Sequence, residues 1–94
     1  MFSEIHVVVM GKVQRVGYRD FIEVYAKEHN LFGWIKNLEN GSVEMVIQGM
    51  PEELKECIEV INEGSLLAKV ESTAIDWRTP EKHFDTFSVI SSYG

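Results

Sequence analysis

The sequence predicts an α+β fold in which two helices cover one face of an antiparallel sheet. Two observations lead to this prediction. Segments with strand-like and helix-like apolar spacing alternate in the order β-α-β-β-α-β, and a last strand-like segment follows. An Asn-Gly pair also separates two apolar runs near the middle of the chain, which is typical of a tight hairpin.

The first strand and the first helix follow from residue spacing. In residues 4–10, Ile5, Val7 and Val9 alternate with His6, Val8 and Met10, and β-branched residues are in excess, which predicts a strand buried on both faces. Residues 20–30 repeat apolar side chains at intervals of three and four, the spacing of a helix with one apolar face. The chain therefore opens with a strand, a loop and a helix.

A hairpin follows around Asn40-Gly41. Both residues tolerate a positive φ angle, so residues 33–38 and 42–48 are expected to pair antiparallel. Asn40 also begins a glycosylation sequon, but without a secretion signal the turn is the preferred interpretation.

The second helix has clear start and stop signals. Pro51 suits the first helical position, and the two glutamates after it favour the positive end of the helix dipole. An apolar stripe follows, and Gly64 marks the end. Residues 68–77 and 85–91 then predict two more strands. Right-handed crossovers joining these elements give a ferredoxin-like sandwich, formed by residues 1–94 as a single domain.

The overall charge limits the partners. The chain of 94 residues carries a net charge of −6, so it is not expected to bind nucleic acid or an anionic membrane. Residues 11–19 and 33–41, however, contain four of the nine basic residues and only one of the fifteen acidic ones. If these two stretches meet, they form a small positive site that suits a small anion.

The lone cysteine and the N-terminus predict the compartment. Cys57 can form no intramolecular disulfide and lies on the apolar stripe of the second helix, which predicts a core residue in a reducing environment. No charged leader or long apolar segment precedes the first strand. We therefore expect a cytoplasmic protein, by default a monomer.

The stretch GKVQRVGYR, residues 11–19, has the chemistry of an anion site. It joins the first strand to the first helix, where unpaired N–H groups and the helix dipole attract negative charge. Arg19 begins the helix, and its guanidinium can hold two oxygens of a phosphate at once. Many loops with glycines and basic residues bind nothing, so this loop alone leaves the question open.

Asn37 is the second candidate. It ends the second strand, and its neutral amide can orient a water molecule without taking up its proton. An asparagine at a strand end is more often a turn former, so its position alone does not assign a function.

Together these residues resemble the acylphosphatase family. GKVQRVGYR resembles the family motif G-x-V-Q-G-V-x-F-R, and GWIKNLENGSVEMVIQG resembles its second motif, a Gly-aromatic-x-Lys-Asn run followed by Gly-x-Val and a closing Gly. The two long motifs lie in the usual order. The resemblance implies an enzyme that hydrolyses acyl phosphates to carboxylate and phosphate without metal or cofactor.

The resemblance also implies the residue roles. Arg19 would hold the phosphoryl group, and Asn37 would position the attacking water. The phosphate-binding segment would comprise Gln14, Arg15, Val16, Gly17, Tyr18 and Arg19, mostly through backbone N–H groups. The substrate would be a small acyl phosphate whose acyl group the sequence does not define.

One departure from the motif leaves alternatives open. Arg15 stands where the family has glycine, and at a positive φ a non-glycine residue costs about 1 kcal/mol. Arg15 either strains the loop, leaving a non-catalytic phosphate-binding domain, or adds charge that attracts the substrate. Two other readings are a domain of a larger carbamoyl-transfer protein and an RNA-binding module, the latter disfavoured by the acidic composition. The three histidines, His6, His29 and His83, show no metal-ligand spacing.

Overall fold

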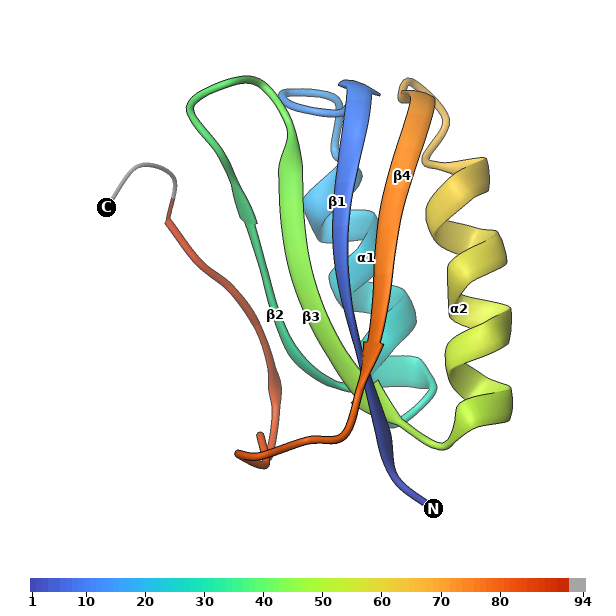
Figure 1. Cartoon of the computed structure of the whole chain (residues 1–94). Helices are drawn as coiled ribbons and strands as arrows, with labels where there is room; N and C mark the ends of the chain where they lie inside the picture. The colour runs from blue at the N-terminus through green and yellow to red at the C-terminus, as the bar shows by residue number, and fades with distance from the viewer. Residues whose placement is uncertain (92–94) are drawn as a thin grey trace.

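The structure, a computed structural model, describes residues 1–91 and contains one sheet and two helices. The sheet has the order β4-β1-β3-β2-β5, and the chain passes through its elements in the predicted sequence (Figure 1). The bounds are β1 Ser3–Lys12, α1 Tyr18–Glu28, β2 Phe32–Asn37, β3 Val43–Gly49, α2 Pro51–Glu63, β4 Lys69–Arg78 and β5 Phe87–Val89.

Both helices pack on the same side of the sheet, with α1 near β2 and β5 and α2 near β1, β3 and β4 (Figure 1). β1 pairs antiparallel with β3 and β4, and β2 pairs antiparallel with β3. This arrangement confirms the predicted sandwich of two helices on one face, with the β2–β3 hairpin turning at the Asn-Gly pair.

Two details of the sheet differ from the prediction. β5 joins β2 in parallel, so the sheet is mixed rather than wholly antiparallel. β1 is completely buried only on the face toward the helices: Ile5, Val7 and Val9 are fully buried, whereas on the other face His6 and Val8 are half-buried and Met10 is exposed. Val8 and Met10 make the second face partly apolar as well, so the sequence pattern does not show which face lacks a covering layer.

The core lies between the sheet and the helices. α2 begins with Pro51 at its first position and ends before Gly64, whose φ of 82° lies in the left-handed region, as its stop signal predicts. The buried side chains that form the core are Ile5, Val7, Val9, Val13, Tyr18, Ile22, Ala26, Leu31, Ile35, Val43, Met45, Ile47, Leu54, Cys57, Ile61 and Phe87.

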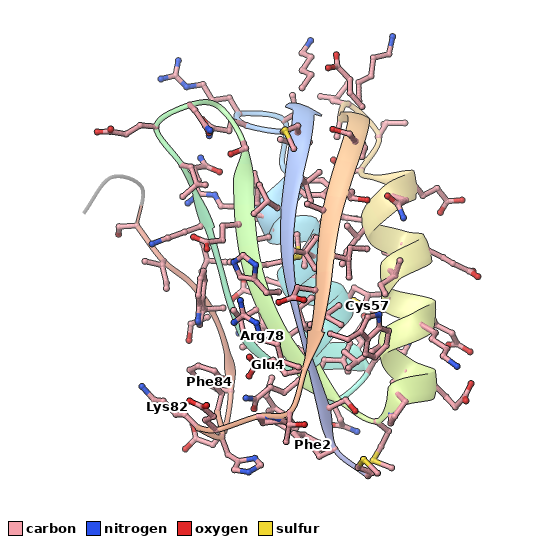
Figure 2. All side chains as sticks on the ribbon, viewed as in Figure 1. Phe2, Glu4, Cys57, Arg78, Lys82 and Phe84 are labelled. Carbon is pink, nitrogen blue, oxygen red and sulfur yellow. The ribbon has the colours of Figure 1, made fainter. Side chains whose placement is uncertain are left out.

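The sheet face opposite the helices carries a polar network around the buried Gln48. Its Nε2 donates to Glu4 Oε1 at 2.8 Å and to the Lys82 carbonyl at 2.6 Å, and its Oε1 accepts from the Phe84 N–H at 3.0 Å. Glu4, Arg78, Lys82 and Phe84 gather at one end of this face (Figure 2). The network holds the β4–β5 connection over the sheet and so directs β5 to its place beside β2.

The β1–α1 loop and the β2–β3 turn lie at the same end of the molecule (Figure 1). The two stretches in which basic residues concentrate therefore meet in space, as a site for a small anion requires.

Candidate functional site: an anion cradle beside an unpaired amide

The β1–α1 loop leaves several backbone donors without acceptors. Arg15 and Gly17 both have left-handed backbone angles, with φ of 62° and 78°, so the chain turns sharply into α1. Within residues 1–91, the N–H groups of residues 15–20 donate to no protein acceptor. Such donors at a helix N-terminus form a binding site for an anion.

A cavity of about 110 Å³ opens at these donors. It is lined by Val13, Arg15, Gly17, Tyr18, Arg19 and Asp20. Four of the six predicted phosphate-binding residues therefore border one hollow of a size that suits a small ligand. Two of the six, Gln14 and Val16, do not line it.

Arg19 is held in place by the residue that follows β5. Its Nη1 donates to the Ile90 carbonyl at 3.1 Å, and the Ile90 N–H in turn donates to the Ile35 carbonyl of β2 at 2.8 Å. A guanidinium has five N–H donors in a fixed plane, so this bond orients the group while leaving other donors for a ligand. The sequence predicted Arg19 but not Ile90, because a carbonyl acceptor leaves no mark on residue type.

The side chain of Gln14 points to the β2–β3 turn. Its Nε2 donates to the carbonyls of Leu38 and Ser42, at 2.8 and 2.9 Å, on either side of the β2–β3 turn. The side chain therefore bridges the loop and the turn instead of lining the cavity. This bridge fixes the distance between the backbone donors and the end of β2.

Asn37 stands at the end of β2 with an unused acceptor. The residue is only 8% exposed, and its Oδ1 has no hydrogen-bond partner among residues 1–91. A buried amide oxygen without a hydrogen-bond partner is uncommon and destabilising, because it loses its hydrogen bonds to water on folding and gains none in return. Such an oxygen can accept a hydrogen bond from a water molecule that enters the site.

Tyr18 and Val16 anchor the loop to the second helix and the segment after it. The buried Tyr18 hydroxyl donates to the Ile61 carbonyl at 2.8 Å, and Ser65 Oγ donates to the Val16 carbonyl at 3.4 Å. Burial, and next the neighbouring Cys57, raise the pKa of Tyr18 well above its usual value, so its hydroxyl stays neutral. What Tyr18 can offer an anion is its backbone N–H.

The remaining titratable groups do not assemble a second reactive centre. Within residues 1–91, no three histidine, cysteine, aspartate or glutamate side chains are placed to hold a metal ion. Cys57 is buried, and burial raises the pKa of its thiol to about 12, as expected of a core residue. His6 pairs with Glu44 at 2.7 Å on the open face of the sheet.

Comparisons with known proteins show the family of the chain. Residues 5–89 match the family model described as acylphosphatase. The chain belongs to the acylphosphatase family. An acylphosphatase from Geobacillus kaustophilus is 41% identical over 85 residues, which cover 87% of this chain and 90% of the relative.

Solved structures extend the comparison. The crystal structure of acylphosphatase from Bacillus subtilis matches with a TM-score of 0.91 at 30% identity, covering 94% of this chain and 98% of that one. A second match is a segment of HypF from T. kodakarensis, at 32% identity and a TM-score of 0.83, where 96% of this chain covers 12% of that protein. The protein is thus an acylphosphatase-family enzyme with the fold of its relatives.

Neither helix found in residues 1–91 has the length and apolar character needed to span a bilayer.

Proposed function

We propose that the protein hydrolyses small acyl phosphates without a metal ion, holding the phosphoryl group at the β1–α1 loop. One observation carries the proposal. Six consecutive backbone N–H groups, those of residues 15–20, have no acceptor among residues 1–91 and adjoin the oriented guanidinium of Arg19. This combination supplies charge stabilisation to a phosphoryl group from fixed donors, which is what phosphoryl transfer chiefly requires.

Asn37 has the role of placing water. Its unpartnered Oδ1 accepts a hydrogen bond from a water molecule, and the Gln14 bridge holds that oxygen at a fixed position relative to the loop. Holding the nucleophile near its target replaces a bimolecular encounter with an oriented one. Because an amide does not take up a proton at neutral pH, Asn37 orients the water and does not act as a base.

The reaction balances with these groups alone. The water oxygen bonds to phosphorus, the bond between phosphorus and the acyl oxygen breaks, and its electron pair leaves with the carboxylate. A proton of the water passes to a phosphoryl oxygen, which yields carboxylate and phosphate. A carboxylate is a stable anion, so no general acid has to protonate the leaving group.

A second candidate function rests on Arg15. Arg15 stands where the family motif has glycine, and its φ of 62° is a conformation that strains a non-glycine residue. If this strain distorts the donors, the protein binds phosphate and does not turn substrate over. The same Arg15 lines the cavity with an exposed cationic side chain, which favours the alternative that it attracts the substrate.

Hydrolysis of benzoyl phosphate in the presence of EDTA tests the proposal. We expect Arg19→Ala to lose both turnover and inhibition by inorganic phosphate, and Asn37→Ala to lose turnover while phosphate still inhibits residual activity or binds by calorimetry. Arg78→Ala and Asn62→Ala are matched controls, because both residues lie outside the site. Wild-type protein that binds phosphate without turnover would favour the second candidate. Normal turnover in either site variant would remove the role assigned to that residue.

We also propose that the protein is a cytoplasmic monomer of one domain that takes small acyl phosphates as its only partners. The buried free thiol of Cys57 and the acidic net charge support this assignment. Light scattering after gel filtration checks the monomer, and a second species of twice the mass would contradict it.

A further inference from the structure

A second hollow continues the phosphate cavity along the outer surface of α1. It has a volume of about 380 Å³ and is lined by Gly17, Asp20, Phe21, Val24, Tyr25 and Glu28. Gly17 and Asp20 line the phosphate cavity as well, so the two hollows meet at the helix N-terminus. We call the second hollow the α1 groove.

The floor of the α1 groove is apolar. Phe21 and Tyr25 pack partly against the core, and Val24 leaves 55% of its surface exposed. An exposed valine beside two aromatic rings offers contact area to an apolar group. The charged groups that line the groove are the carboxylates of Asp20 and Glu28.

The α1 groove and the proposed water position at Asn37 lie on different sides of the backbone donors of residues 15–20. Arg19 leans toward β5 and β2 through its bond to Ile90, on the side where Asn37 ends β2. Phe21, Val24 and Glu28, in contrast, follow one another along α1 at intervals of three and four residues. At 3.6 residues per turn they lie on the flank of the helix opposite Arg19. The groove therefore runs away from Asn37.

In-line transfer connects this arrangement to the substrate. The attacking water and the leaving oxygen lie on opposite sides of phosphorus in such a reaction. With the water at Asn37 on the β2 side, the leaving carboxylate points across the helix N-terminus, toward Gly17 and the α1 groove.

We infer that the α1 groove receives the acyl group of the substrate and favours uncharged, apolar acyl groups over those that carry a second anionic group. This inference rests on the proposed function. Phe21, Val24 and Tyr25 supply apolar contact to the acyl group. The carboxylates of Asp20 and Glu28 repel a second negative charge.

The experiment compares kcat/KM for three substrates: acetyl phosphate, benzoyl phosphate and succinyl phosphate, the last with a free carboxylate. In Val24→Ser the ratio of benzoyl to acetyl phosphate falls about fivefold, the effect of losing about 40 Å² of apolar contact. In Val24→Phe, which enlarges the apolar wall, the same ratio does not fall. The matched control Val60→Ser, on α2, leaves the ratio at the wild-type value.

Charge reversal tests the inferred repulsion between the groove carboxylates and a second anionic group on the substrate. Glu28→Lys raises the ratio of succinyl to acetyl phosphate about fivefold at low salt, and the increase shrinks at high salt. Glu81→Lys makes the same change of net charge on the other face of the protein and leaves the ratio unaltered. Circular dichroism and thermal unfolding of each variant establish that it is folded before its rates are compared.

The outcomes separate this inference from the proposed function. Absence of hydrolysis of all three substrates by folded wild-type protein would overturn the proposed function and the inference with it. Hydrolysis with ratios that Val24→Ser and Glu28→Lys leave unchanged would overturn the inference alone, and would mean that the acyl group extends into solvent.

Discussion

Replacing Arg15 by glycine should stabilise the protein, because Arg15 is held in a left-handed backbone conformation. Its φ is 62° and its side chain is exposed, so the substitution removes no buried contact. A left-handed conformation costs a non-glycine residue about 1–2 kcal/mol. Glycine, however, adds about 0.4–1 kcal/mol of conformational freedom to the unfolded chain.

The difference is a gain of about 0.5–1 kcal/mol in the free energy of unfolding for Arg15→Gly. For a domain of this size the gain corresponds to a rise of about 3–6 °C in Tm. Calorimetry and urea unfolding measure both quantities. Arg15→Ala is the matched control, because it removes the charge and keeps a Cβ at the strained position, and its Tm should stay near the wild-type value.

The same variants measure what the Arg15 charge contributes to the reaction. Because Arg15 lines the cavity, we expect both variants to raise KM for benzoyl phosphate and to weaken its dependence on salt. A Tm of Arg15→Gly at or below that of Arg15→Ala would refute the strain argument. A higher kcat in Arg15→Gly alone would show instead that the strain impairs the wild-type loop.

Three further predictions concern the supports of the site. Gln14→Ala removes two hydrogen bonds to the β2–β3 turn and should lower the free energy of unfolding, measured in urea, by about 1–3 kcal/mol. In this variant kcat should fall more than the affinity for phosphate. A change in phosphate affinity alone would argue against the bridge. Tyr18→Phe should cost about 1–2 kcal/mol by losing the buried bond to Ile61, and equal stability would contradict that bond. Cys57 contributes stability that is complete below pH 9 and is lost as pH rises toward 12, because burial raises its pKa from 9.0 to about 12; unfolding measured from pH 8 to 11 should show a steeper decline for wild type than for Cys57→Ala.

Much of the fold was predictable because local signals agreed with it. The Asn40-Gly41 pair fixed the hairpin, and Pro51 and Gly64 fixed the limits of α2. The parallel pairing of β5 was not predictable, because that strand has only three residues and its position depends on the network around Gln48. A buried glutamine gives no sign in the sequence of which backbone groups it will bind.

The candidate site, like the fold, was predictable from the sequence only in part. The resemblance to the family motifs identified Arg19 and Asn37 as candidate site residues. The structure adds that the side chain of Gln14 joins the two segments in which they lie. The supporting partners of Arg19 and Tyr18 are the carbonyls of Ile90 and Ile61, which any residue type could supply. Sequence reasoning therefore finds the groups that act on a ligand more readily than the groups that hold them.

The central claim is that a water molecule beside Asn37 attacks phosphorus, and the position of oxygen labelling tests it most directly. Wild-type protein would hydrolyse benzoyl phosphate in water enriched in oxygen-18, and mass spectrometry would locate the label in the products. We expect one labelled oxygen in phosphate and none in benzoate, because the β1–α1 loop holds the phosphoryl group and the bond between phosphorus and the acyl oxygen breaks. Label in benzoate would mean that water attacks the carbonyl carbon, and the roles assigned to Arg19 and Asn37 would be wrong.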